Sequence, residues 1–380
     1  MKVALLKNSN GHWEQQEDND VLDTQKVQLV ICFGLKQKLQ SDRVHEQLKL
    51  GFPVAKIVLS SDSGGIIGNE VKDNHLLAVA IEFEHTLVSG VQVKIADYGG
   101  DSYAAGKAIA SSFDINGAPS YLMLISDGTL VNGSELVKGI NEIFKGKIPV
   151  TGGLAGDGTE FGSTVVGLDE EPVSGNIVGI FLKGEKLRVS YGSKGGWEIF
   201  GPERIVTKSK GNQLFEINSE GALDLYKKYL GSFAKDLPKS ALLFPLSVKF
   251  TDDSEPVVRT ILQIDQHSNS MTFAGDIPEG SKVRFMKANF DRLIEAAGRA
   301  ASMVNPSAKA PKLAFLISCV GRKIILESRT EEEVDAVKEA FGNETLLIGF
   351  YSYGEISPLS NSSDCALHNQ TMSITTIDEI

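Results

Sequence analysis

The chain has 380 residues, too many for one ordinary hydrophobic core, so its length favours two domains. Hydrophobic residues make up 42% of the chain, which is typical of a globular protein and well below the level of a membrane protein. The formal net charge is 38 − 49 = −11, and no stretch gathers Lys and Arg into a stripe, which argues against a nucleic-acid or anionic-membrane partner.

The amino-terminal apolar run ends at Lys7 and is too short for the apolar region of a signal peptide. No apolar run in the chain approaches the length that spans a membrane. The three cysteines, Cys32, Cys319 and Cys365, are odd in number and widely spaced, which favours free thiols in a reducing compartment. We therefore expect a cytoplasmic protein without a membrane partner.

One small pattern occurs three times: an apolar strand, a helix, a second apolar strand and a polar loop that leads into another strand-like run. The strands of the three copies lie at 28–34 and 54–68, at 121–128 and 148–158, and at 313–322 and 346–356. Helical periodicity occupies the segment between the strands of each copy. The sequence therefore predicts a mixed α/β fold with mixed sheets, repeated strand–helix–strand units and two related halves packed together.

The expected organisation along the chain has four parts. Residues 1–24 are read as an amino-terminal strand and polar loop, and residues 25–205 as the first domain. Residues 206–235 change in character and are read as a connecting helix region, before a second domain at 236–380.

The repeated units end in loops that carry candidate ligand-binding groups. The loops 60–68 and 152–162, the second with Gly152 and Gly153, expose backbone N–H groups that can hold a carboxylate or phosphate. Neither loop has the Lys of a Walker A motif, and tight turns at glycine are the alternative interpretation. Asp62, Asp157 and Glu355 lie at or near these loops, where a carboxylate can bind an ammonium group or cap its own turn.

Two further clusters could carry chemistry. Cys319 and Arg322 follow the strand at 313–319, so Cys319 could be a nucleophile or a buried apolar residue, and Arg322 could hold a carboxylate. His368 and Asn369 precede the last strand, where His368 could be a haem ligand, a proton carrier or a structural histidine. The other histidines have no zinc-site spacing, so no metal site is expected.

The carboxyl-terminal motifs resemble those at the end of a FIST C-terminal domain. The segment 349–356 reads GFY-x-x-GEI, residues 368–371 read HN-x-T, and residues 319–322 read C-x-GR. Segments 124–128, 150–158, 206–217 and 221–231 resemble the FIST N-terminal domain, in the same order along the chain. The resemblance covers nearly the whole chain, from about residue 25 to about residue 375.

This resemblance implies an intracellular sensory module for a small ligand, with amino acids or other carboxylates suggested, that signals through a partner such as a histidine kinase. A haem-binding nitric-oxide sensor with His368 as axial ligand, and less strongly a Cys319-dependent hydrolase, are the alternatives. No convincing catalytic constellation is present, so an enzyme is not expected. The expected ligand-binding residues are Asp62, Gly152, Gly153, Asp157, Arg322, Tyr351, Tyr353, Glu355, His368 and Asn369.

Overall fold

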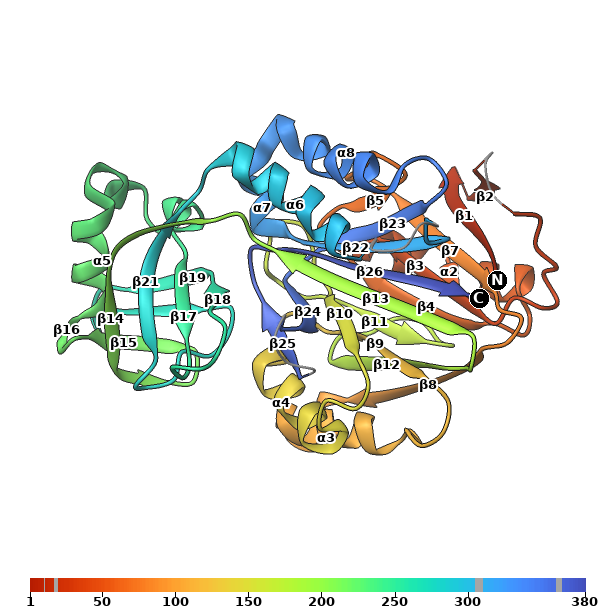
Figure 1. The fold of residues 1–380 in the computed structure, drawn as a ribbon, viewed down its shortest axis with the longest axis horizontal. Helices are drawn as coiled ribbons and strands as arrows, with labels where there is room; N and C mark the ends of the chain where they lie inside the picture. Colours follow the sequence, from red (N-terminus) through yellow and green to blue (C-terminus); the bar gives the residue numbers. More distant parts are fainter. Residues whose placement is uncertain (10, 17–19, 305–309, 360–363) are drawn as a thin grey trace.

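The computed structural model describes residues 1–9, 11–16, 20–304, 310–359 and 364–380. Its described residues form three six-stranded sheets and one eight-stranded sheet. Both parallel and antiparallel strand pairs occur, with helices packed on the sheets, so the expected mixed α/β class is confirmed. Figure 1 shows three sheets gathered in one body and the fourth standing to one side.

The three six-stranded sheets follow a common plan. The first has the order β11 (Val166–Leu168), β4 (Lys56–Ser61), β3 (Leu29–Gly34), β7 (Leu76–Glu82), β1 (Lys2–Ser9) and β2 (His12–Gln15). The second has the order β25 (Cys365–His368), β24 (Gly354–Pro358), β10 (Val150–Leu154), β9 (Ser120–Ser126), β12 (Asn176–Lys183) and β8 (Leu87–Lys94). The third has the order β13 (Leu187–Lys194), β26 (Met372–Glu379), β22 (Leu313–Cys319), β23 (Leu346–Ser352), β5 (Gly65–Ile67) and β6 (Glu70–Lys72).

One parallel strand pair lies inside each of these sheets, and a helical connection joins its two strands. The connections are α1 (Lys36–Ser41) and α2 (Val44–Gly51) from β3 to β4, α4 (Gly133–Phe144) from β9 to β10, and α7 (Val320–Leu326), η4 (Glu327–Arg329) and α8 (Thr330–Phe341) from β22 to β23. The three predicted strand–helix–strand units are therefore confirmed.

The units exchange strands in a cycle. The second parallel strand of each unit pairs with the short strand that follows the parallel pair of another unit: β4 with β11, β10 with β24, and β23 with β5. Three backbone hydrogen bonds close the same cycle where these strands end. The amide of Gly156 donates to the Ser61 carbonyl at 3.1 Å. The amide of Tyr353 donates to the Leu154 carbonyl at 3.1 Å, and the amide of Ser63 donates to the Tyr351 carbonyl at 2.9 Å.

The inner faces of the three sheets share one apolar core. Buried side chains from all three sheets form a single cluster, in which Phe33 of the first sheet stacks on Phe350 of the third with ring centroids 4.6 Å apart. Helices cover the outer faces: α1 and α2 the first sheet, α3 (Ser102–Ser111) and α4 the second, and α6 (Phe290–Val304) and α8 the third. A short helical turn, η1 (Ile95–Tyr98), precedes α3.

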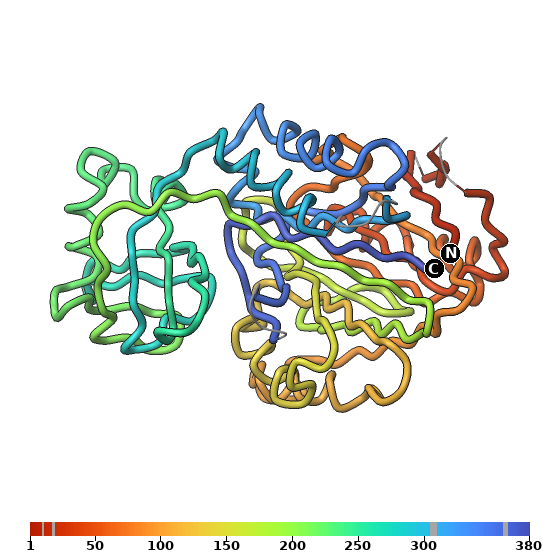
Figure 2. Tube along the Cα trace, in the orientation of Figure 1, coloured from red at the N-terminus to blue at the C-terminus, as the bar shows by residue number. Residues whose placement is uncertain are grey.

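The eight-stranded sheet is an insertion between β13 and α6, which we call the inserted module (residues 198–287; Figure 2). Its strands are β14 (Glu198–Lys210), β15 (Gln213–Ile217), β16 (Glu220–Gly221), β17 (Leu246–Lys249), β18 (Val257–Arg259), β19 (Ile261–Asp265), β20 (Ser270–Phe273) and β21 (Lys282–Lys287), with helices α5 (Ala222–Leu230), η2 (Gly231–Asp236) and η3 (Lys239–Leu243). The region 206–235, read from the sequence as a connection, lies within this module. Arg259 Nη1 ties it to the main body by donating to the Leu367 carbonyl at 2.9 Å.

Within the described residues, no helix combines the length and the apolar character that crossing a membrane requires. At the amino terminus, β1 and β2 occupy part of the segment expected as a strand and polar loop, and residues 10 and 17–19 of that segment lie outside the described residues.

Candidate functional site

Loops that follow the parallel strands of all three units meet around a pocket of about 430 Å³, which we call the loop pocket. Its lining is Leu35 after β3, Ser63 and Gly64 after β4, Asp73 after β6, Gly158 and Thr159 after β10, and Val320, Lys323, Ile324, Glu327 and Thr330 after β22. The pocket therefore lies at the carboxyl ends of parallel strands, the position at which α/β proteins bind ligands.

Lys323 is the cation of the loop pocket. Its Nζ donates to the Ser63 carbonyl at 2.8 Å and forms an ion pair with the Asp73 carboxylate. Only 19% of the Lys323 side chain is exposed, against 82% of Asp73. Gly64 has φ of +132°, and a Cβ there would collide with Lys323 Nζ, so glycine lets the ammonium group approach this loop. Sequence reasoning missed Lys323, although it directly follows Arg322.

Asp62 is buried beneath the first loop of this pocket and holds it by hydrogen bonds. Its Oδ2 lies 2.8 Å from His75 Nε2, and its Oδ1 accepts the amide proton of Gly64 at 2.9 Å. Both Asp62 and His75 are buried. The carboxylate therefore fixes the turn that carries Ser63 and Gly64 to the pocket wall.

Asp157 has the corresponding role in the second loop. Its Oδ2 accepts the amide protons of Gly162 and Ser163 at 2.8 and 2.7 Å, and its Oδ1 accepts the hydroxyl proton of Tyr353. Phe161 stacks on the Tyr353 ring with centroids 4.6 Å apart. Burial, more than the neighbouring carboxylate, raises the pKa of Tyr353, so its hydroxyl stays protonated and available to donate.

Gly152 and Gly153 lie in β10 itself, before the loop begins. A Cβ on Gly153 would stand 2.8 Å from Ile317 Cγ2, and one on Gly152 would collide with the Leu124 carbonyl. These glycines allow β10 to pack closely against its neighbours, and they present no backbone nest to a ligand.

Arg322 lies fully buried behind the loop pocket. Its Nε and Nη2 contact Glu333 Oε2 at 2.9 and 2.8 Å, and the remaining N–H groups donate to the carbonyls of Gly195 at 2.6 Å, Leu293 at 2.8 Å and Gln370 at 3.4 Å. The Arg322 guanidinium therefore donates its hydrogen bonds to acceptors inside the protein.

Tyr351 belongs to the same buried network as Arg322. Its hydroxyl donates to Glu333 Oε1 at 2.8 Å, and Ser318 Oγ donates to the same oxygen at 3.0 Å. The family motifs at 319–322 and 349–356 therefore meet in the interior, around one carboxylate on α8.

Glu355 is a second buried carboxyl group in this region. Thr371 donates to it from its amide at 3.1 Å and its hydroxyl at 2.8 Å, and Ser352 Oγ donates at 2.9 Å. Burial outweighs these hydrogen bonds and raises the pKa of Glu355 to about 8. The Glu355 contacts connect the GFY-x-x-GEI motif to the HN-x-T motif.

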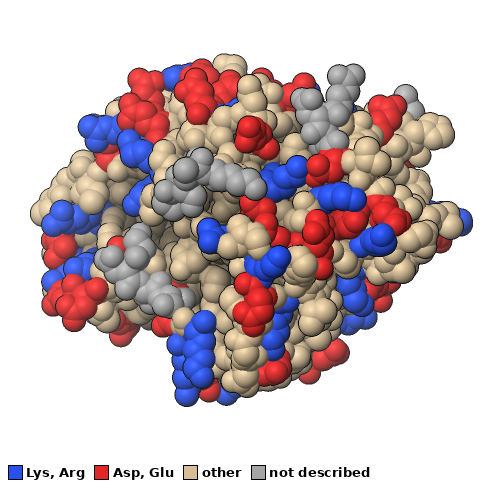
Figure 3. Space-filling view, turned by 45° about the vertical axis from the view of Figure 1, so that its right-hand side comes forward, with Lys and Arg blue, Asp and Glu red and all other residues tan. Residues whose placement is uncertain are grey.

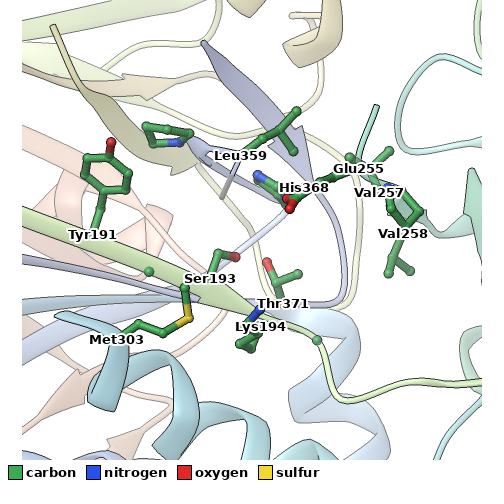
Figure 4. Close-up of a pocket in the computed structure, with 14 residues that line it drawn as sticks. Tyr191, Ser193, Lys194, Glu255, Val257, Val258, Met303, Leu359, His368 and Thr371 are labelled. Carbon is green, nitrogen blue, oxygen red and sulfur yellow. The ribbon is translucent and has the colours of Figure 1, made fainter. Parts of the chain in front are cut away.

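His368 lines a second pocket, of about 280 Å³, between the main body and the inserted module (Figure 4). Its Nε2 donates to the Ser357 carbonyl at 3.1 Å, which leaves Nδ1 as a hydrogen-bond acceptor. Burial lowers the pKa of His368 to about 4, so the ring is neutral at pH 7. Lys194, Glu255, Val258, Met303 and Thr371 line the same pocket.

Asn369 lies behind this pocket, where its Nδ2 donates to the His368 carbonyl at 3.0 Å. Asn369 Oδ1, Ser357 Oγ and both amide atoms of Gln370 are buried without a hydrogen-bond partner among the described residues.

Haem was the cofactor raised by the sequence, with His368 as its axial ligand. The pocket beside His368 is about 280 Å³, and small-molecule sites span about 300–1,000 Å³. This pocket is therefore too small for a tetrapyrrole. Across the described ranges, no group of three or more His, Cys, Asp and Glu side chains is placed to hold a metal ion.

Cys319 lies buried at the end of β22. Burial, with the nearby Glu355 adding to it, raises the pKa of the Cys319 thiol. A protonated thiol without solvent access is a poor nucleophile, so this position fits packing better than thiol catalysis.

The charged surface is mixed in sign. Lys and Arg side chains alternate with Asp and Glu over the described part of the face in Figure 3.

The fold and its pockets together define an α/β protein of repeated units, with one pocket at the strand ends and a smaller one beside the inserted module. A family comparison matches the FIST N domain over residues 28–220 and the FIST C domain over residues 222–358. The chain therefore belongs to the FIST family, whose domains are generally taken as sensory domains that bind small ligands in signal transduction. Comparison with curated proteins gives no significant match.

Replacing Arg322 by Ala is predicted to destabilise the protein by about 3–5 kcal/mol, because it leaves the Glu333 carboxylate buried and unpaired. Urea unfolding measures this change. Arg299→Ala, at a surface ion pair with Glu295, is the control and should cost less than about 0.5 kcal/mol. An Arg322→Ala protein of wild-type stability that had lost ligand binding would instead support the ligand-binding role expected from the sequence.

The contribution of Glu355 to stability is predicted to fall as the pH rises from about 4.5 to about 8, because Glu355 has a pKa of about 8 when folded and an ordinary value when unfolded, whereas the lowered pKa of His368 acts in the opposite direction below about pH 6.5. The folded protein holds this proton over that window and the unfolded chain releases it, so raising the pH favours unfolding. Urea unfolding at pH 5 and pH 8 should show a smaller decrease for Glu355→Gln than for the wild type. Equal decreases in the two proteins would contradict this assignment.

Proposed function

We propose that this chain is a sensory module that binds a small carboxylate-bearing ligand, an amino acid or another organic acid, in the loop pocket and signals through a partner protein. One observation carries the proposal: loops from all three units converge on one pocket, and its least exposed charged side chain is Lys323. An ammonium group in a partly dry pocket attracts a carboxylate more strongly than one in open water.

Lys323 takes the anion-binding role in this proposal, and Arg322 is left out of the ligand site. Asp62, Asp157 and Tyr353 act indirectly, since they hold the two glycine loops in the shape that forms the pocket. Ligand contacts are assigned to Lys323, to the apolar wall and to the polar groups at the rim.

Pocket geometry also supports a sensing role. Leu35 and Ser63 come from the first unit, Gly158 from the second and Lys323 from the third, so a bound ligand would touch all three. Binding would therefore stabilise the arrangement in which the three units meet around the ligand. The output would pass to a separate protein, with a histidine kinase as one candidate.

The two alternatives find less support. A haem sensor would need space beside His368 that the second pocket does not offer. A Cys319-dependent hydrolase would need an accessible thiol with a low pKa, whereas the thiol is buried and its pKa is raised.

A thermal-shift screen of amino acids and other organic acids tests the proposed function. A true ligand at roughly a hundred times its Kd should raise the melting temperature by about 3 °C. Lys323→Gln should reduce the shift to about half or less, and Lys228→Gln, at an exposed lysine on α5 with 72% of its side chain accessible, should retain it. A full shift in Lys323→Gln would place the ligand elsewhere.

A further inference from the structure

One part of the loop-pocket lining is apolar. Leu35, Val320 and Ile324 contribute aliphatic side chains, of which Leu35 and Ile324 are partly exposed and Val320 is almost fully buried. Such a wall gains free energy from burying hydrocarbon, in proportion to the area removed from water. The ligand of this pocket should therefore carry an apolar body beside the group that meets Lys323.

The Asp73 carboxylate occupies the place at which that ligand's own carboxylate would bind Lys323. Asp73 is 82% exposed, so its carboxylate can return to water at little cost, as in other surface ion pairs. Lys323 is much less exposed and keeps its second partner, the Ser63 carbonyl. A ligand carboxylate can thus replace Asp73 on an ammonium group that is already positioned.

An α-ammonium group on the ligand would find only exposed carboxylates. Both oxygens of Asp62 accept hydrogen bonds from within the structure, and so do both oxygens of Asp157. Glu327 and the displaced Asp73 are exposed to water, where their charges are screened. Within the lining that the structure describes, an ammonium group would therefore leave water without a buried acceptor, which is unfavourable.

We propose that the loop pocket selects an apolar monocarboxylate, whose carboxylate displaces Asp73 from Lys323 and whose hydrocarbon part packs on Leu35, Val320 and Ile324. This inference rests on the proposed function and deepens it by choosing one class of organic acid. Asp73 then acts as an internal competitor that sets the affinity of the site.

Isothermal titration calorimetry with octanoate tests this inference. Wild-type protein should bind one octanoate per chain, and Lys323→Gln should bind it about 10- to 100-fold more weakly, since a charged hydrogen bond is lost. Asp73→Asn should bind it up to about fivefold more tightly because the competitor is gone. Asp252→Asn, at another exposed ion-paired aspartate, makes the same charge change and should leave the affinity unchanged.

Two further probes of the same chain length separate the ligand classes. Octylammonium should not bind measurably, and 2-aminooctanoate should bind about tenfold more weakly than octanoate, because its ammonium group lacks a buried partner. Tighter binding of either probe than of octanoate would overturn the inferred ligand class. If Ile324→Trp, which fills the pocket, abolished that binding, the proposed function would still stand. If none of the three probes bound the wild-type protein, the inferred ligand class would fail, and the thermal-shift screen with Lys323→Gln would still decide the proposed function.

Discussion

The cyclic exchange of strands among the three units is the constraint on which the remaining structure depends. Three backbone hydrogen bonds, which join Gly156 to Ser61, Tyr353 to Leu154 and Ser63 to Tyr351, bring the ends of β10, β23 and β4 together. Because each second strand also pairs with a strand from another unit, no unit can complete its sheet alone. The loops that leave these strand ends must then crowd together, and the loop pocket is a consequence of that crowding.

The three carboxyl-terminal family motifs contribute mainly buried side chains that bond to one another. Arg322 and Tyr351 share Glu333, and Glu355 holds Thr371, so the three carboxyl-terminal motifs form a buried polar network beneath both pockets. Such a network is stable only when its members are paired, and it therefore fixes a single arrangement of β22, β23 and the turn before β26. The residues that face the ligand, Lys323 above all, stand beside these motifs.

Much of the fold follows from the sequence, because the period-2 and helical patterns of the three units are strong and local. The strand exchange does not follow from the sequence, because it pairs strands that are far apart along the chain, such as β4 and β11. The site residues also differ in how far the sequence predicts their roles. Asp62 and Asp157 were recognised by position, but only coordinates show that their oxygens hold their own loops. Arg322 and Lys323 are neighbours on a helix, where successive side chains point about 100° apart, so one faces the core and the other the pocket.

Hydrogen–deuterium exchange with and without octanoate tests whether one ligand contacts all three units, because it reports on all of them in one experiment. We expect slower exchange at residues 62–64, at 158–159 and along α7 together, since one ligand would touch each of these segments. Slower exchange confined to β25 and the inserted module would contradict binding in the loop pocket and would move the ligand to the pocket beside His368.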